Sequence, residues 1–182
     1  MLRQLPNFLT LIRLLASPLI AWLLLRSRFQ EALGLVLLAG LTDWFDGFTA
    51  RRLQVSGSLG VILDPVADKT LLVTLFLVLG VMGLLPPWLV VLVIGRDLVI
   101  VTGALLLRLT RNIRQFIPST SGKVSTFFQI VLVLTVLIYA ALPNELVLLL
   151  RNVALFLSAF FTALSGLDYL RRGIQMANRQ PF

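Results

Sequence analysis

Four of the chain's eight acidic residues lie between positions 43 and 68. Asp43 and Asp46 are three positions apart and Asp64 and Asp68 are four apart, so on two helices each pair shares a face. The four carboxylates could therefore converge on one point. Carboxylates with few nitrogen or sulfur ligands nearby select hard cations such as Mg²⁺ or Mn²⁺, the usual partners of phosphate chemistry. The spacing predicts a two-metal site for phosphoryl transfer.

The surroundings of these aspartates are apolar, which makes a cationic partner necessary. Each unpaired Asp at the centre of a membrane helix costs about 2.5 to 3.5 kcal/mol, so four would cost roughly 10 to 14 kcal/mol. The alternative is that the acids only mark helix ends at the membrane surface. That reading accounts for one or two acids. It does not account for four at matched spacings with two glycines and an arginine between them.

The whole segment fits the pattern D-x2-D-G-x2-A-R-x8-G-x3-D-x3-D without a departure. It resembles the signature of the CDP-alcohol phosphatidyltransferase family (class I), and the hydropathy resembles that family along essentially the whole chain. The residues that meet the pattern are Asp43, Asp46, Gly47, Ala50, Arg51, Gly60, Asp64 and Asp68.

Composition places the chain in a membrane. With 182 residues, 58% of them hydrophobic, it is predicted to be one domain, residues 1–182, and an integral membrane protein. It has no Cys and no His, so acid–base chemistry must fall to Asp, Glu, Lys or Tyr. The net charge of +8 indicates contact with anionic lipid at membrane surfaces and not nucleic-acid binding.

The fold class predicted is all-α, a polytopic membrane protein with six transmembrane helices and both termini in the cytoplasm. The first apolar run lacks the features of a signal peptide, so we interpret it as a retained span. Basic residues concentrate on one side, and the other side holds only Arg26, Arg28 and Arg151. We expect a bacterial inner membrane location with the aspartates facing the cytoplasm. The predicted spans are 8–27, 30–50, 60–82, 87–109, 122–142 and 146–170.

Two cations within predicted spans are candidates for binding an anionic substrate. Arg96 lies midway along the fourth span, where it needs an anionic partner or a structural ion pair. Asp97 is adjacent but falls on another helix face, so we do not expect the two to pair. Lys123 follows Gly122 in a polar start to the fifth span, and the surrounding residues do not make a phosphate-binding P-loop.

The family resemblance implies a reaction in which a hydroxyl attacks the lipid-side phosphate of a CDP-lipid and displaces CMP. It implies two divalent cations, Mg²⁺ or Mn²⁺, held by the four aspartates, with Asp68 as general base. Arg51 would pair with the diphosphate, and a homodimer is possible. The resemblance also implies a nucleotide pocket beside the polar face of the first span, for which the CDP-lipid-binding candidates are Asn7, Thr10, Asp43, Asp46, Gly47, Ala50, Arg51 and Gly60. For Asn7 and Thr10 the alternative is a helix cap and a hydroxyl bonded to the backbone.

The sequence resembles two branches of the family that use different acceptors. The segments TDWFDGF and LDPVADK resemble the branch that uses glycerol 3-phosphate. The Arg96–Asp97 pair and the segment PSTSGKVSTFFQ resemble at least as closely the cardiolipin synthase branch, which uses phosphatidylglycerol. We favour CDP-diacylglycerol and glycerol 3-phosphate as the substrates, with Arg96 and Lys123 binding the acceptor.

A cation transporter and a scaffold without catalysis are the two alternative classes of protein. A cation transporter would have acids spread through the bundle core, whereas these acids cluster at one face. A scaffold without catalysis is disfavoured because no position of the motif is substituted.

Overall fold

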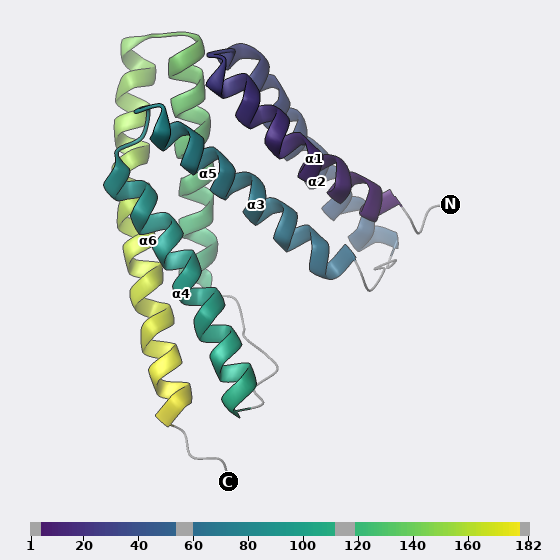
Figure 1. Cartoon of the computed structure of the whole chain (residues 1–182), viewed down its shortest axis with the longest axis vertical. Coiled ribbons are helices and arrows are strands. Elements are labelled where there is room, and N and C mark those ends of the chain that lie inside the picture. The colour runs from purple at the N-terminus through teal and green to yellow at the C-terminus, as the bar shows by residue number, and fades with distance from the viewer. Residues whose placement is uncertain (1–4, 54–59, 112–118, 179–182) are drawn as a thin grey trace. The chain divides into compact units, whose positions relative to one another are not determined.

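The computed structural model describes the backbone of residues 5–53, 60–111 and 119–178, and the side chains of residues 14–42, 69–103 and 119–175. All regular secondary structure in this part of the chain is helical, as the sequence predicts. The helices, shown in Figure 1, are α1 (Leu5–Leu25), α2 (Phe29–Leu53), α3 (Gly60–Val81), α4 (Pro87–Arg111), α5 (Thr120–Ala141) and α6 (Glu145–Asn178).

Residues that favour turns or caps mark the helix boundaries. Gly83 adopts a positive φ of 73° just after α3, a conformation that glycine takes without steric penalty, and Pro87 begins α4. The Ser119 hydroxyl accepts the Gly122 N–H at 3.0 Å and caps α5. Asn144 accepts the Leu146 N–H at 2.8 Å and caps α6.

The last helix is longer than its apolar run predicts. α6 continues to Asn178, whereas the apolar run ends near position 170. The residues that follow include Arg, Gln, Met and Ala, which are good helix formers, so the helix does not end where the hydrophobic stretch ends.

By its internal contacts the chain divides into two compact units. The first comprises Met1–Leu84 with Val136–Pro143, and in it α1 packs against both α2 and α3. The core between these helices includes Ile20, Leu24 and Phe76, which are fully buried. Both pairs of motif aspartates belong to this unit.

The second unit comprises Leu85–Thr135 and Asn144–Phe182. Here α4 packs against α6, and the two run side by side in Figure 1. Phe128 of α5 stacks on Phe161 of α6 with ring centroids 4.7 Å apart. Arg96 and Lys123, the two candidate acceptor ligands, both lie in this unit.

The two faces of α6 have opposite character. Large apolar side chains at i, i+3 and i+4 spacings are exposed, whereas the buried face carries small and polar residues. Such an arrangement is typical of a helix whose outer face contacts lipid, because membrane helices pack through small residues and interhelical hydrogen bonds. The exposed residues are Leu146, Leu149, Val153, Phe156, Phe160, Leu164 and Leu167, and the buried ones are Ala154, Ser158, Thr162 and Ser165.

Within the side chains that the structure describes, two helical stretches are long and apolar enough to cross a membrane. They are Thr120–Ala141 and Glu145–Gln175. The prediction of six spans with both termini in the cytoplasm therefore stays a prediction.

Candidate active site

The motif aspartates lie on two consecutive helices, as their spacing predicts. Asp43 and Asp46 are on α2, and Asp64 and Asp68 are on α3. At 1.5 Å per residue, Asp46 lies about 10 Å before the end of α2 and Asp68 about 12 Å after the start of α3. Measured along their helices, all four aspartates therefore lie within about 15 Å of the segment that joins α2 to α3, and both helices pack against α1.

The side chains of these aspartates lie outside the described residues. The convergence of the four carboxylates therefore stays a prediction. Among the side chains that are described, no group of three or more acids could hold a metal ion. The donor set of the motif, four carboxylates without nitrogen or sulfur ligands on neighbouring helices, fits a hard divalent cation.

The other motif candidates also lie on these helices. Asn7 and Thr10 are on α1, the residues from Gly47 to Arg51 are on α2, and Gly60 begins α3. Their side chains fall outside the described part of the chain. Their proposed contacts with a CDP-lipid stay predictions.

Arg96 is buried in the second unit, with 8% of its surface exposed, and its guanidinium contacts side chains of both α4 and α6. Its Nη1 lies 2.8 Å from the Asp97 carboxylate. Its Nε and Nη2 donate to the Ser165 hydroxyl at 3.2 and 2.6 Å. The prediction that Arg96 and Asp97 do not pair is wrong, because the long flexible arginine stem lets the guanidinium reach around the helix to its neighbour.

Tyr169 of α6 joins Arg96 to the start of α5. The guanidinium carbon of Arg96 lies 5.7 Å from the centre of the Tyr169 ring, within the range of a cation–π contact. The Tyr169 hydroxyl accepts the Ser119 N–H at 3.1 Å. The Tyr169 ring thus contacts α4, and the Tyr169 hydroxyl contacts the start of α5.

A second side chain of α6, Asp168, also contacts the first turn of α5. The Ser121 hydroxyl donates to Asp168 Oδ2 at 2.6 Å, and Arg172 donates to the other oxygen of Asp168 at 3.0 Å. Lys123, two residues beyond Ser121, is exposed. The structure thus brings Arg96 into the network at the first turn of α5, the turn that leads into Lys123.

Further along α5 and α6 a buried polar cluster continues the interface. Ser125 and Thr162 lie 3.1 Å apart through their hydroxyls, and Gln129 donates to Thr162 at 3.0 Å. Gln129 Oε1 and Ser158 Oγ are buried with no hydrogen-bond partner in the described part of the molecule. These contacts fix the register of α5 against α6.

The model of one protein family matches residues 3–164 of this chain. The chain belongs to the CDP-alcohol phosphatidyltransferase family. The resemblance inferred from the aspartate motif is thereby confirmed.

Similar members of the CDP-alcohol phosphatidyltransferase family include enzymes with two different names. The CDP-diacylglycerol–glycerol-3-phosphate 3-phosphatidyltransferase of Aquifex aeolicus is 36% identical, over 94% of this chain and 96% of its own length. The enzyme of the same name from Bacillus subtilis is 34% identical, over 76% and 70%. The cardiolipin synthase (CMP-forming) of Rattus norvegicus is 32% identical, over 92% and 61%.

In this CDP-alcohol phosphatidyltransferase, sequence reasoning missed the contribution of α6. Ser158, Thr162, Ser165 and Tyr169 recur at helical spacing and therefore share one face. That polar stripe on an otherwise apolar helix was the available signal.

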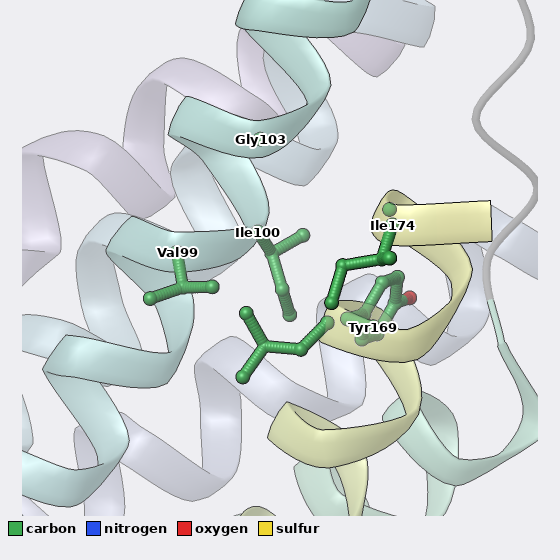
Figure 2. Close-up of a pocket in the computed structure, with 7 residues that line it drawn as sticks. Val99, Ile100, Gly103, Tyr169 and Ile174 are labelled. Atoms are coloured by element: carbon green, nitrogen blue, oxygen red, sulfur yellow. The ribbon is translucent and has the colours of Figure 1, made fainter. Parts of the chain in front are cut away.

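An apolar cavity of about 170 Å³ adjoins Tyr169. Figure 2 shows Ile100 of α4 and Ile174 of α6 pointing into the space between their helices, with the Tyr169 ring at one edge. The cavity is lined by Val99, Ile100, Gly103, Tyr169, Leu170, Gly173 and Ile174.

Proposed function

We propose that this protein transfers the phosphatidyl group of CDP-diacylglycerol to glycerol 3-phosphate and releases CMP, a step of phospholipid biosynthesis. The observation that carries the proposal is the complete aspartate motif in a chain that aligns over 94% of its length with a transferase named for that reaction. A cardiolipin synthase that uses phosphatidylglycerol is the second candidate, because relatives of that name also match.

The proposed chemistry assigns a task to each group of motif residues. Asp43, Asp46, Asp64 and Asp68 hold two divalent cations, Mg²⁺ or Mn²⁺. When bound, the cations neutralise the diphosphate and stabilise negative charge on the transferring phosphoryl group. Arg51 pairs with the diphosphate.

The proposed transfer is a substitution at the lipid-side phosphorus. Asp68 takes the proton from the acceptor hydroxyl, whose oxygen forms a bond to that phosphorus. The bond between the phosphorus and the oxygen of CMP breaks, and CMP leaves with the electron pair. The products are CMP and phosphatidylglycerol phosphate.

The proposed membrane arrangement places this chemistry at headgroup depth. We infer six spans with both termini in the cytoplasm, which puts the end of α2 and the start of α3 on the cytoplasmic side of a bacterial inner membrane. Glycerol 3-phosphate reaches that side from solution, and the lipid enters sideways from the bilayer. The asymmetry of basic residues supports this orientation.

Acceptor dependence of CMP release tests the proposed reaction. Purified protein with CDP-diacylglycerol is expected to release CMP when glycerol 3-phosphate is added, and to release little with phosphatidylglycerol. Chromatographic measurement of CMP gives both rates. Faster release with phosphatidylglycerol would move the chain to the cardiolipin synthase branch.

Of the two proposed acceptor ligands, Lys123 is the one that can be replaced without an expected effect on folding. Arg96→Ala would leave the buried Asp97 carboxylate without its arginine, a change expected to impair folding. Lys123 is exposed and forms no ion pair with a described residue, so its removal should not disturb the core.

Lys123→Ala is expected to raise the Michaelis constant for glycerol 3-phosphate about tenfold or more, because a charge-assisted contact to the phosphate is lost. The constant for CDP-diacylglycerol should stay within about twofold. Arg171→Ala removes an exposed cation from α6 and serves as the control. If Lys123→Ala changes the Michaelis constants for glycerol 3-phosphate and CDP-diacylglycerol equally, Lys123 does not bind the acceptor.

A further inference from the structure

The first turn of α5 is held against α6 by two side-chain contacts just before Gly122. The Ser119 N–H donates to the Tyr169 hydroxyl at 3.1 Å, and the Ser121 hydroxyl donates to Asp168 at 2.6 Å. Asp168 and Tyr169 are consecutive on α6. A short segment of one helix therefore sets the position of the turn that precedes Lys123.

Gly122 shows how closely the groups in this network approach one another. A Cβ added at this buried glycine would lie 3.0 Å from the Tyr169 hydroxyl and 3.2 Å from both Arg96 Nη2 and Ser119 Oγ. These separations are tighter than ordinary van der Waals contact. A methyl group on the α5 backbone would therefore require the arginine head or one of the hydroxyls to shift.

Tyr169 contacts both Arg96 of α4 and the start of α5. Its ring lies beneath the Arg96 guanidinium, with 5.7 Å between the guanidinium carbon and the ring centre. Its hydroxyl accepts the backbone N–H at the start of α5. Tyr169 thus links Arg96 directly to the turn that leads into Lys123.

We propose that Tyr169 is a positioning residue for acceptor binding, which sets the separation between Arg96 and Lys123 so that both can contact the phosphate of the acceptor. The inference rests on the proposed function and adds a residue to it. Tyr169 itself does not contact the reacting atoms. It acts through the two cations.

Tyr169→Phe tests this role, because it keeps the ring beneath Arg96 and removes the hydroxyl that holds α5. The Michaelis constant for glycerol 3-phosphate is expected to rise about threefold to tenfold, in line with the loss of one hydrogen bond. The turnover number at saturating acceptor and the constant for CDP-diacylglycerol should stay within about twofold. The chain's other tyrosine provides the matched control, Tyr139→Phe, for which no change is expected.

A double variant separates positioning from general stability. In a Lys123→Ala background, Tyr169→Phe is expected to raise the constant for glycerol 3-phosphate by less than about twofold, because the cation that it positions is gone. If Tyr169→Phe raises the Michaelis constant for glycerol 3-phosphate as much in that background as it does alone, the proposal is overturned. It is also overturned if Tyr169→Phe alone leaves this constant unchanged. A rise in the Michaelis constants for both substrates, together with a lower yield of folded protein, would overturn it as well.

Wild-type turnover distinguishes failure of the inference from failure of the proposed function. If wild-type protein uses glycerol 3-phosphate and Tyr169→Phe matches it, only the positioning role is wrong. If wild-type protein does not use glycerol 3-phosphate, the proposed function and this inference both fail.

Discussion

Replacement of Asp68 by Asn is expected to lower the rate of CMP release by about 100-fold or more while CDP-diacylglycerol still binds. Asn keeps the size and polarity of the side chain but cannot take the proton of the acceptor hydroxyl. The loss should therefore appear in turnover and not in lipid affinity. A coupled assay of CMP release and a binding titration with the CDP-lipid measure the two quantities separately.

Asp43→Asn provides the contrast on the neighbouring helix. Asp43 is proposed to hold the cation on the nucleotide side, so its replacement should weaken binding of the CDP-lipid as well as turnover. Both variants must elute from size-exclusion chromatography like the wild-type protein. If Asp68→Asn retains more than about a tenth of the wild-type rate, Asp68 is not the general base.

Removal of divalent cations is expected to abolish CMP release, and addition of Mg²⁺ or Mn²⁺ is expected to restore it. The reason is that four carboxylates close to a diphosphate would repel the substrate unless cations lie between them. The measurement is the rate of CMP release in excess EDTA, followed by titration with each metal.

Direct binding separates a metal held by the protein from one carried by the substrate. Calorimetric titration of Mn²⁺ into metal-free protein without CDP-lipid should show binding in the wild type and weaker binding in Asp43→Asn. Asp168→Asn, which alters a carboxylate in the other unit, should bind Mn²⁺ like the wild type. Full activity in excess EDTA would contradict the two-metal hypothesis.

The sequence predicts the helices well because their boundaries depend on local chemistry. Gly83 and the prolines that follow it interrupt the apolar pattern between α3 and α4, and the chain turns there. The placement of both aspartate pairs on helices was likewise predictable. Their spacing of three and four positions has a direct meaning only on a helix.

The contacts of Arg96 could not be predicted from position alone. A helical wheel separates Arg96 from Asp97 by about 100°, which argues against a pair. The wheel ignores the length of the arginine side chain, whose guanidinium reaches Asp97, Ser165 and the Tyr169 ring. Side-chain reach and the register of α5 against α6 are properties of the packed structure.

The identity of the lipid product tests the central claim most directly. Purified protein is incubated with CDP-diacylglycerol and isotopically labelled glycerol 3-phosphate, and the lipids are separated by thin-layer chromatography and identified by mass spectrometry. The account predicts labelled phosphatidylglycerol phosphate in the same amount as the CMP released, and none from Asp68→Asn. Formation of cardiolipin from added phosphatidylglycerol, with no label entering lipid from glycerol 3-phosphate, would contradict it.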